Sequence, residues 1–250
     1  MSASSSLNGK VALVTGAARR IGAAISRRLH QHGANVAIHY RGSADEANSL
    51  CDTLNALRSD SATPLRADLS DTGAFPDLIK SVTDWHGQLD ILINNASSFY
   101  PTPLGQVSEA DWDNLIGTNL KAPLFLAQAA LVPLQASRGV IVNIVDIHAQ
   151  RPLRNHAVYG AAKAGLAMLT RSLAKDLAPD IRVNGVSPGA ILWPESELSD
   201  DAKNSILGQI PLGRTGEPDD IAGCVLYLVR DATYVTGQII AVDGGRSIGW

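Results

Sequence analysis

A tyrosine and a lysine stand four residues apart in the segment Tyr159-Gly160-Ala161-Ala162-Lys163. On a helix this spacing places the phenol and the ammonium on one face. A free phenol is a poor acid at neutral pH, because its pKa is about 10. We expect the Lys163 ammonium to lower the pKa of Tyr159 and so to let the phenol exchange a proton with a substrate. The same pair also occurs on helices by chance, so the surrounding residues must decide its meaning.

A glycine-rich turn follows the first apolar run of the chain and reads Thr15-Gly16-Ala17-Ala18-Arg19-Arg20-Ile21-Gly22. Gly16 allows a tight turn, and Gly22 allows the following helix to approach the strand closely. The unpaired N–H groups and the dipole at the start of that helix can then bind a pyrophosphate. We therefore predict a dinucleotide site formed by Gly16, Arg19, Arg20, Ile21 and Gly22. The alternative is a turn that has its glycines for backbone reasons alone.

The end of the second apolar run indicates which dinucleotide binds. Proteins that select NAD usually place an acidic residue about 20 residues after the glycine turn, where it holds the ribose 2′-OH. This chain instead has His39-Tyr40-Arg41-Gly42-Ser43, and its next acidic residue is Asp45. Arg41 and Ser43 can meet a 2′-phosphate, so we predict NADPH, with His39 and Tyr40 in the same site. The alternative is that Arg41 is a solvated loop residue.

Two more segments follow later apolar runs, where ligands of open α/β sheets bind: Ala67-Asp68-Leu69 and Asn94-Asn95-Ala96. We predict cofactor contacts from Asp68, Leu69, Asn95 and Ala96. Asp68 can accept a hydrogen bond from the adenine amino group. The competing interpretation of this region is helix capping by the neighbouring Ser70 or Asp71.

These motifs require a scaffold in which strands and helices alternate. Short apolar runs, nearly continuous as in strands covered on both faces, predict seven strands at 11–15, 35–40, 64–67, 91–94, 140–145, 182–186 and 239–242. Helical patterns fill the gaps at 21–32, 44–57, 75–86, 111–134, 158–177, 202–210 and 218–229. The alternation predicts an α/β fold of Rossmann type with a doubly wound, seven-stranded parallel sheet. We expect one domain at 7–250 after a loose Ser-rich tail at 1–6.

Composition and charge exclude several classes of protein. The chain has 250 residues, of which 45% are hydrophobic and 18% charged, as in a folded enzyme and unlike a disordered chain. A net charge of −3 with scattered arginines argues against nucleic-acid binding. Cys51 and Cys224 stand far apart, which indicates neither a disulfide framework nor a metal site. No run reaches the roughly 18 apolar residues of a membrane span, and we expect a cytoplasmic protein.

Together these motifs resemble the short-chain dehydrogenase/reductase family over nearly the full length of the chain. The likeness extends to Asn184 and Pro188-Gly189 after the sixth apolar run and to Asp243-Gly244-Gly245 after the seventh. The resemblance implies a catalytic tetrad of Asn119, Tyr159, Lys163 and a serine thirteen residues before the tyrosine. It also implies cofactor contacts from Tyr159, Lys163, Pro188 and Gly189, and a homotetramer.

The serine of this tetrad is missing, and its position is occupied by Asp146. A serine there donates a hydrogen bond to a substrate carbonyl. A carboxyl group in a partly buried site can instead have a raised pKa and deliver a proton. The exchange therefore suits reduction of a ring C=N better than reduction of a ketone. The alternative is an inactive relative that has lost its serine.

Other departures resemble the pteridine reductases of this family. Arg20 stands where the first motif usually has its middle glycine, and Ser97 replaces the glycine that usually follows Asn-Asn-Ala; the runs 39–48 and 94–104 are also similar to theirs. The resemblance implies that Arg20 reaches both pyrophosphate and pterin, and that Ser97 bonds a cofactor phosphate and the pterin. Phe99 would hold a flat ring against the nicotinamide. The alternative is that Phe99 is an ordinary core phenylalanine.

Two features differ from the pteridine reductases. Position 156, where the trypanosomatid enzymes carry a tyrosine beside the pterin, is His156. The loop 190–198, which should line the substrate pocket, is diverged and contains Trp193. We expect Trp193 to contact the substrate together with Asp146 and Tyr159, and His156 to be a substrate contact or a surface residue rather than a general base.

The predicted reaction is hydride transfer from NADPH to a C=N carbon of a pterin, or of dihydrofolate. The adjoining nitrogen would be protonated by Tyr159, or by Asp146 directly or through water, with Lys163 and Asn119 supporting a proton path. One alternative is a dihydromonapterin or dihydrofolate reductase of the same family, and another is a ketone reductase in which Asp146 is incidental. A third is a non-catalytic NADPH-binding regulator, against which the intact Tyr159 and Lys163 argue.

Overall fold

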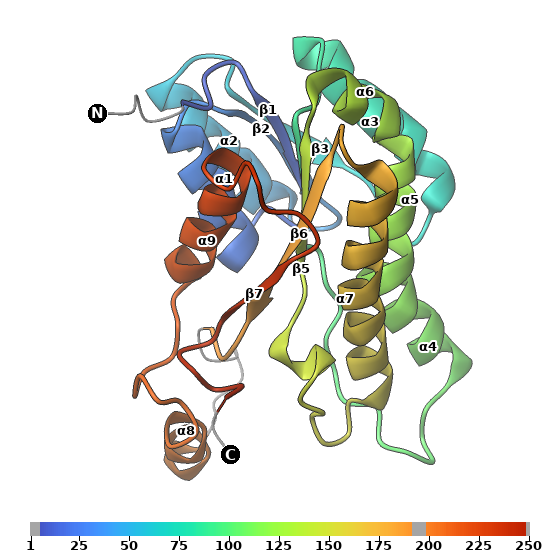
Figure 1. Ribbon diagram of the computed structural model, residues 1–250, viewed down its shortest axis with the longest axis vertical. Helices are drawn as coiled ribbons and strands as arrows, with labels where there is room; N and C mark the ends of the chain where they lie inside the picture. Colours follow the sequence, from blue (N-terminus) through green and yellow to red (C-terminus); the bar gives the residue numbers. More distant parts are fainter. Residues whose placement is uncertain (1–5, 192–198, 249–250) are drawn as a thin grey trace.

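The computed structural model describes residues 6–191 and 199–248 and contains a parallel sheet between two layers of helices (Figure 1). Its strands are β1 (Val11–Val14), β2 (Asn35–Tyr40), β3 (Ala62–Arg66), β4 (Ile91–Asn94), β5 (Val140–Ile144), β6 (Arg182–Pro188) and β7 (Ile239–Val242). They are ordered β3-β2-β1-β4-β5-β6-β7, and each neighbouring pair is parallel. The predicted doubly wound, seven-stranded α/β fold is confirmed.

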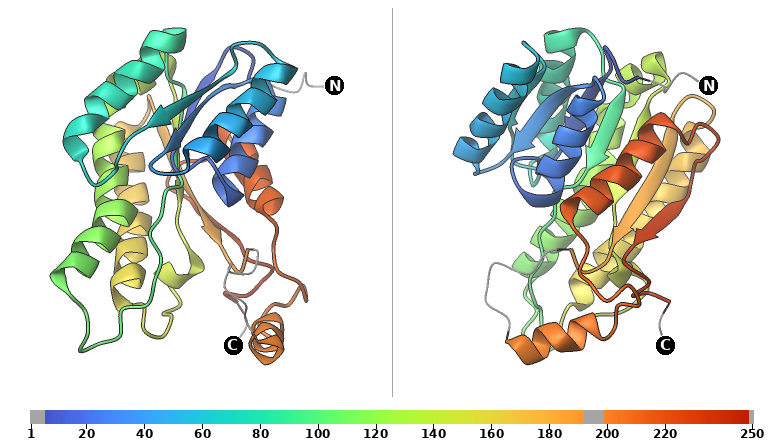
Figure 2. Two further views of the ribbon diagram at one scale, coloured as in Figure 1. Left: turned by 180° about the vertical axis from the view of Figure 1, so that it is seen from behind. Right: turned by 90° about the vertical axis from the view of Figure 1, so that its left-hand side faces the viewer.

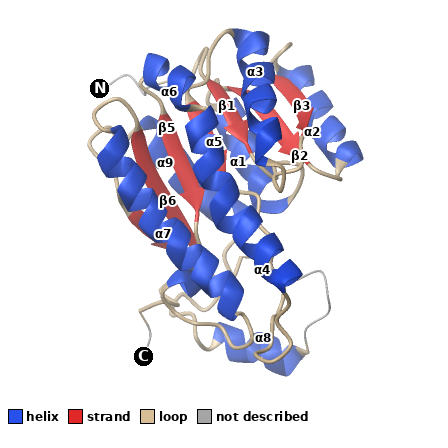
Figure 3. Ribbon diagram, turned by 90° about the vertical axis from the view of Figure 1, so that its right-hand side faces the viewer, coloured by secondary structure: helices blue, strands red, loops and turns tan. Residues whose placement is uncertain are grey.

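Helices cover both faces of the sheet (Figures 1 and 2). One layer contains α1 (Arg20–Gln31), α2 (Ala44–Leu57) and α9 (Pro218–Arg230). The other layer contains α3 (Phe75–His86), α5 (Ala122–Ala129), α6 (Leu131–Ser137) and α7 (Ala157–Leu177), and α4 (Glu109–Ile116) continues it past the sheet. Apart from both layers lies α8 (Asp200–Leu207), at one end of the molecule (Figure 3).

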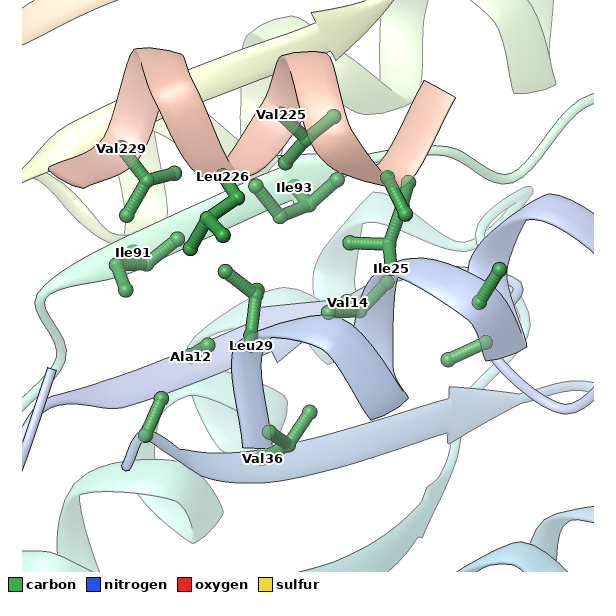
Figure 4. Close-up of a cluster of buried hydrophobic side chains, with 14 of the residues drawn as sticks. Ala12, Val14, Ile25, Leu29, Val36, Ile91, Ile93, Val225, Leu226 and Val229 are labelled. Atoms are coloured by element: carbon green, nitrogen blue, oxygen red, sulfur yellow. The ribbon is translucent and has the colours of Figure 1, made fainter. Parts of the chain in front are cut away.

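Alternate residues of β1 enter opposite cores, because successive side chains of a strand point to opposite faces. Ala12 and Val14 pack in the core under α1, α2 and α9, whereas Val11 and Leu13 pack in the core under α3, α5 and α7. Figure 4 shows the first of these cores, where apolar side chains of α1 and α9 meet over the strands. The apolar strands of the sequence are therefore explained by a sheet covered on both faces.

The helix predicted at 111–134 is in fact three helices joined at two irregular points. It starts earlier than predicted, because Ser108 and Asp111 form a capping box in which each side chain accepts the other's backbone N–H. Between α4 and α5 the chain makes a π turn, η2 (Gly117–Lys121). The axis then bends by 60° before α6. The prediction of a single helix was therefore wrong. A π turn contains one more residue than an α-helical turn, and the spacing of the apolar residues does not reveal it.

Other predicted boundaries differ by only a few residues from those observed. Strand β3 begins at Ala62, and α8 covers Asp200–Leu207 rather than 202–210. Strand β6 continues to Pro188, which pairs with Val242 of β7. Proline is tolerated at such a position because it is the last residue of the strand and needs no further ladder bond.

The chain order reverses between β1 and β4, which leaves a crevice at the carboxyl edge of the sheet. Backbone hydrogen bonds join the loops at this edge. The Ala17 N–H donates to the carbonyl oxygen of His39 at 2.9 Å, and the Ala67 N–H donates to that of Tyr40 at 3.1 Å. The three loops after β1, β2 and β3 are thereby held side by side, as a ligand that spans them requires.

Within the described residues, no single helix is long and apolar enough to cross a membrane. Only the bent pair Glu109–Ala129 and Leu131–Ser137 meets that length and composition together.

Candidate active site

Tyr159, from the first turn of α7, meets Asp146, from the end of β5. The Tyr159 hydroxyl donates to Oδ2 of Asp146 across 2.7 Å. Oδ1 of Asp146 accepts the backbone N–H of His148 at 2.8 Å, which caps the short turn η3 (Ile147–Ala149) and fixes the carboxyl orientation. Tyr159 is 4% exposed, and Asp146 is half-buried. The two groups predicted to carry the transferred proton therefore share one direct hydrogen bond.

Lys163 lies one turn further along α7 and is buried. Its Nζ donates to the carbonyl oxygen of Ile144 at 2.9 Å and lies 5.8 Å from the centroid of the Tyr159 ring. Burial lowers the pKa of Lys163 to about 8, while the charge of Asp146 acts in the opposite direction. The ammonium is thus anchored to the backbone of β5 beside the pair.

The expected effect of Lys163 on Tyr159 is wrong for this geometry. Burial raises the pKa of Tyr159 well above its ordinary value, and the charge and the hydrogen bond of Asp146 raise it further. The Ser97 hydroxyl acts in the opposite direction. The sequence spacing predicted an ammonium as the deciding neighbour, but the folded chain places a carboxylate there. The resting site therefore holds Tyr159 as a protonated donor.

Asn119 lies in the π turn and is fully buried. Its Nδ2 donates to the carbonyl oxygens of Ser98 and Leu115, each at 2.9 Å. Its Oδ1 accepts from the Ser97 hydroxyl at 2.6 Å. The π turn packs against α7, which carries Tyr159 and Lys163, so that the predicted catalytic residues gather in one place. Single π turns within helices frequently occur at functional sites.

Phe99 presents an aromatic face beside the proton donor. Its ring stacks on His156, with centroids 4.7 Å apart and planes at 17°, and meets the Tyr159 ring edge-on at 4.8 Å. The His156 imidazole is held in place by Nδ1, which lies 2.7 Å from the carbonyl oxygen of Arg154. Phe99 is 55% exposed, so the alternative that it is a core residue is wrong. An exposed ring at this position can receive a flat ligand.

A cavity of about 680 Å³ opens at the carboxyl edge of the sheet, where the chain order reverses between β1 and β4. It is lined by predicted cofactor residues from four loops, namely Gly16, Arg19, Arg20, Ile21, Gly22, His39, Tyr40, Arg41, Ser43, Asp68, Leu69, Asn95, Ala96 and Ser97. The lining also includes four residues that the sequence analysis did not single out, namely Ala18, Gly42, Ser98 and Thr118. Each of these directly neighbours a predicted site residue, which is the signal that identifies them.

The glycine turn has the close approaches that its motif predicts. Gly16 has a φ of +60°, and a Cβ there would lie 2.9 Å from Cα of Ala96. A Cβ on Gly22 would lie 2.3 Å from the carbonyl oxygen of Gly16. Asn95 stabilises the turn, because its Nδ2 donates to the carbonyl oxygens of Thr15 at 2.8 Å and Gly16 at 3.0 Å. Asn95 therefore shapes the turn as well as lining the cavity.

Thr15 is a supporting residue that the sequence analysis missed. Its Oγ1 accepts the backbone N–H groups of Asn95 at 2.9 Å and Ala96 at 3.0 Å, and donates to the carbonyl oxygen of Ile93 at 3.2 Å. It thereby ties the loop after β4 to the end of β1. The available signal was a hydroxyl residue at the end of an apolar strand, directly before Gly16.

Arg20 adopts a left-handed backbone conformation, with a φ of +52°. This conformation costs a non-glycine residue about 1–2 kcal/mol, which explains why a glycine is favoured at such a position. Arg20 is the first residue of α1 and lines the cavity. Strained backbone at a ligand site indicates that the side chain has a role.

His39 lies on β2 and is 2% exposed. Its Nδ1 accepts the Gly16 N–H at 3.1 Å, so the ring hydrogen must lie on Nε2, which is 3.2 Å from the carbonyl oxygen of Ala67. Burial lowers the pKa of His39 to about 4, while the bond to Ala67 and the charge of Asp68 oppose this effect. Predicted only as a cofactor contact, His39 is also a neutral imidazole that holds the glycine turn.

Arg41 and Asp68 belong to the loops after β2 and β3, and both line the cavity. Asp68 Oδ1 accepts the backbone N–H of Ser70 at 2.9 Å and its hydroxyl at 2.8 Å, and these bonds hold the pKa of Asp68 below its ordinary value, with help from Arg41. The next turn, η1 (Thr72–Ala74), is capped by Asp71. Capping is therefore the role of Asp71, and Asp68 remains at the cavity.

Pro188 and Gly189 lie at the carboxyl end of β6 and do not line this cavity. Gly189 packs against the loop after β7, where a Cβ would lie 2.6 Å from Cβ of Asp243. Trp193 lies outside the described residues, so its contact with substrate stays a prediction. Among residues 6–191 and 199–248, no three His, Cys, Asp or Glu side chains gather in a way that would hold a metal ion.

The chain is similar to proteins of known activity along almost its whole length. A family model described as enoyl-(acyl carrier protein) reductase matches residues 16–247. The 3-oxoacyl-[acyl-carrier-protein] reductase FabG of Staphylococcus aureus is 40% identical over 240 residues, which cover 94% of this chain and 97% of that protein. Pteridine reductase 1 of Leishmania tarentolae is 39% identical over 280 residues, with coverages of 95% and 96%. FabG of Thermotoga maritima is 36% identical over 247 residues, with coverages of 97% and 99%.

Proposed function

The chain belongs to the short-chain dehydrogenase/reductase family of oxidoreductases, and we propose that within this family it is an NADPH-dependent pteridine reductase. The observation that carries the proposal is the hydrogen bond of Tyr159 to Asp146. A serine hydroxyl at position 146 does not ionise near neutral pH, whereas a carboxyl group can carry either a proton or a negative charge. The pair therefore suits a substrate whose reduced atom must become an N–H.

The substrate ring would lie on Phe99. The ring of Phe99 is exposed, stacks on His156 with one face and stands edge-on to Tyr159, so a flat heterocycle on its other face would lie beside the proton donor. Offset stacking of aromatic rings contributes about 0.5–1.5 kcal/mol beyond buried area. A pterin is flat and carries the C=N bonds and ring N–H groups that this arrangement can hold. Asp146 would accept from the ring N–H groups of such a ligand.

Both the volume of the cavity and the backbone of the glycine turn that lines it suit a dinucleotide. The turn at Gly16 and Gly22 leaves no room for a side chain, so a phosphate can approach the start of α1. Arg41 and Ser43 would hold a ribose 2′-phosphate, which favours NADPH over NADH. When bound, NADPH supplies the hydride that reduces the substrate carbon. Tyr159 and Asp146 then supply the proton to the adjoining nitrogen, while Lys163 would bind the nicotinamide ribose.

Carbonyl reduction is the second candidate, because similarity to the 3-oxoacyl-[acyl-carrier-protein] reductases is equally strong. In that case Tyr159 would protonate a carbonyl oxygen, and Asp146 would be incidental. A dihydromonapterin or dihydrofolate reductase remains a narrower form of the first proposal. A non-catalytic NADPH-binding regulator is the remaining alternative.

One assay separates these functions. NADPH oxidation is followed with biopterin, dihydrobiopterin, dihydromonapterin, dihydrofolate, a 3-oxoacyl thioester and a simple ketone. Faster turnover of biopterin and dihydrobiopterin than of the carbonyl compounds supports a pteridine reductase. Turnover of only the dihydro rings indicates the narrower reductase, and preference for the thioester or ketone overturns the proposal. Tight NADPH binding without turnover of any compound favours the regulator.

We also propose that the protein is a cytoplasmic homotetramer, as the family resemblance implies. Trp112 of α4, Leu124 of α5 and Met168 of α7 are large apolar side chains on the exposed face of one helical layer, and they suit an interface between subunits. The mass of the purified protein in light scattering tests this state directly.

A further inference from the structure

Ser43 and Glu46 stand three residues apart at the start of α2, in the order that is typical of a capping box. In such a box the serine side chain accepts the backbone N–H of the acidic residue, whose carboxylate accepts that of the serine. Neither bond is present between these two residues, both of which the structure describes. The same arrangement is complete at α4, between Ser108 and Asp111. The cap of α2 is therefore open, although its residues could close it.

The backbone of Ser43 differs from that of the residue that caps α4. Ser43 has a φ of −90° and a ψ of 62°, whereas Ser108 has a φ of −98° and a ψ of 160°. Capping residues usually have the extended backbone of Ser108. A Cβ on the preceding Gly42 would meet no atom within 4 Å, so this part of the loop has room to turn. A rotation about ψ of Ser43 therefore separates the open cap from a closed one.

Glu46 directs its carboxylate toward Arg19 instead of toward Ser43. Its Oε1 lies 3.6 Å from Nη1 of Arg19, and the side chains of Arg19 and Glu46 are 56% and 46% exposed. Arg19 lies directly before α1 and lines the cofactor cavity, whereas Glu46 does not line it. An exposed ion pair contributes little stability by itself, but a single helix cap is also a small contribution. The pair can therefore decide between two partners for the same carboxylate.

The direction of Glu46 matters because Arg41 and Ser43 lie in the part of the cavity wall where a ribose 2′-phosphate is expected. A closed box would occupy the hydroxyl and the N–H of Ser43 and would bring a carboxylate to the phosphate, which repels it. An acidic residue beside the ribose is instead the arrangement of proteins that select NAD. The open cap leaves Ser43 available to the phosphate.

We propose that Arg19 holds Glu46 away from Ser43, and that the direction of Glu46 thereby determines the preference for NADPH over NADH. The proposal rests on the proposed function in one respect, that a 2′-phosphate lies at Arg41 and Ser43. Without Arg19 the carboxylate turns back to the start of α2 and closes the box. The site then resembles that of a protein that selects NAD, and NADPH binds less well relative to NADH.

Urea unfolding tests the open cap without any cofactor. Ser43→Ala should leave the unfolding midpoint of the wild type unchanged, because the Ser43 hydroxyl caps nothing, whereas Ser108→Ala should lower it. In the Arg19→Ala protein, where the box can close, Ser43→Ala should lower the midpoint as well. Arg28→Ala is the matched control, because Arg28 is an arginine of α1 that pairs with Asp219 at 3.9 Å and does not line the cavity.

In the Arg28→Ala protein, Ser43→Ala should again leave the midpoint unchanged. A midpoint that Ser43→Ala lowers in the wild type would show that the cap is already closed, and would overturn the proposal. A midpoint that Ser43→Ala leaves unchanged in the Arg19→Ala protein would overturn it too, because Arg19 would not be what keeps the cap open.

Cofactor binding tests the specificity role, through the ratio of the Kd of NADH to that of NADPH in fluorescence titrations. Arg19→Ala should lower this ratio at least about 10-fold, because it removes a positive charge and releases Glu46. Adding Glu46→Gln to Arg19→Ala should raise the ratio again by at least about fivefold, whereas Glu46→Gln alone should change it by less than about twofold. Equal effects of Glu46→Gln in both backgrounds would mean that its carboxylate acts only as a distant charge, which contradicts the proposal.

These results can be told apart from a failure of the proposed function. A wild-type protein that binds NADH as tightly as NADPH would refute the 2′-phosphate site and with it the specificity role. A protein that binds NADPH but reduces no pterin would refute the pteridine reductase, while the unfolding and binding comparisons would still decide the role of Glu46.

Discussion

Tyr159 donates its hydroxyl hydrogen to Oδ2 of Asp146 across 2.7 Å, so the proposed acid of this site is bonded directly to a carboxyl group. The burial of Tyr159 and the charge of Asp146 both resist ionisation of the phenol. Proton release from Tyr159 therefore requires that a bound cofactor and the substrate offset this resistance. Four predictions follow from the contacts of the cofactor cavity and of this pair, and a fifth concerns Asp146 itself.

Replacing Tyr159 by phenylalanine removes the phenolic proton and leaves the ring that meets Phe99 edge-on. We expect kcat to fall by about 100-fold to 10,000-fold, the range typical of a general acid. The Kd of NADPH, measured by fluorescence titration, should change by less than about threefold, because Tyr159, although expected from the sequence to contact the cofactor, does not line the cofactor cavity. A Tyr159→Phe enzyme that retains most of its kcat would show that Asp146 delivers the proton alone.

Arg20→Gly relieves the left-handed backbone strain at a φ of +52°. The free energy of unfolding should rise by about 0.5–1 kcal/mol in urea titrations, after allowance for the greater freedom of glycine in the unfolded chain. NADPH binding should weaken about 10-fold, because a charge-assisted phosphate contact is lost. Arg138→Gly is the matched control, since Arg138 has a φ of +49° at the end of α6.

The control should gain similar stability and bind NADPH as the wild type does. If Arg20→Gly also binds NADPH normally, the side chain of Arg20 has no role at the pyrophosphate. If neither variant gains stability, the strain assigned to these two positions is wrong.

His39 predicts a pH dependence of stability. Its pKa of about 4 in the folded protein lies below the ordinary value of 6.5. Between these two pH values the unfolded chain therefore binds more protons than the folded protein. The free energy of unfolding should therefore fall as the pH decreases from 6.5 to about 4, by up to about 3 kcal/mol from this residue. His39→Phe cannot titrate and should lose this part of the dependence, although it also leaves the Gly16 N–H without its partner.

Urea unfolding of both proteins between about pH 4.5 and pH 7.5 checks this prediction. His30 and His32, whose pKa values are also lowered by burial, remain in both proteins and contribute equally to the two slopes. Identical slopes for wild type and His39→Phe would mean that His39 is not held neutral by the fold.

Arg41 should decide the choice of dinucleotide. Arg41→Ala removes the positive charge expected at the 2′-phosphate, and we expect the Kd of NADPH to rise about 10-fold while that of NADH changes by less than twofold. Arg27→Ala is the control, because Arg27 is an exposed residue of α1 that does not line the cavity. Equal weakening of both cofactors by Arg41→Ala would argue that Arg41 does not contact the 2′-phosphate.

The sequence predicted the fold well because its signals are local. Predicted runs such as 35–40 and 91–94 coincide with β2 and β4, since a strand buried on both faces consists mainly of apolar residues. The π turn at Gly117–Lys121 was missed, because one extra backbone residue leaves no mark in the spacing of apolar side chains. That turn is also what carries Asn119 into the site.

The candidate site was predicted as a set of residues but not as a set of interactions. Asp146 was identified from its position before Tyr159, and the two side chains do meet. The direction of the pKa shift of Tyr159 was predicted wrongly, because spacing along α7 identifies Lys163 as a neighbour but cannot reveal that the carboxylate of Asp146 is bonded to the phenol. The role of His39 under the glycine turn likewise depends on a backbone N–H that only the folded chain brings to it.

The central claim is that Asp146 makes this protein a reductase of pterin C=N bonds. The most direct measurement compares kcat/KM of the wild type and of Asp146→Ser with dihydrobiopterin and with a 3-oxoacyl thioester. Because a serine hydroxyl cannot release a proton to a ring nitrogen near neutral pH, we expect pterin reduction to fall at least about 10-fold, while thioester reduction is unchanged or rises. Undiminished pterin reduction by Asp146→Ser would contradict the account.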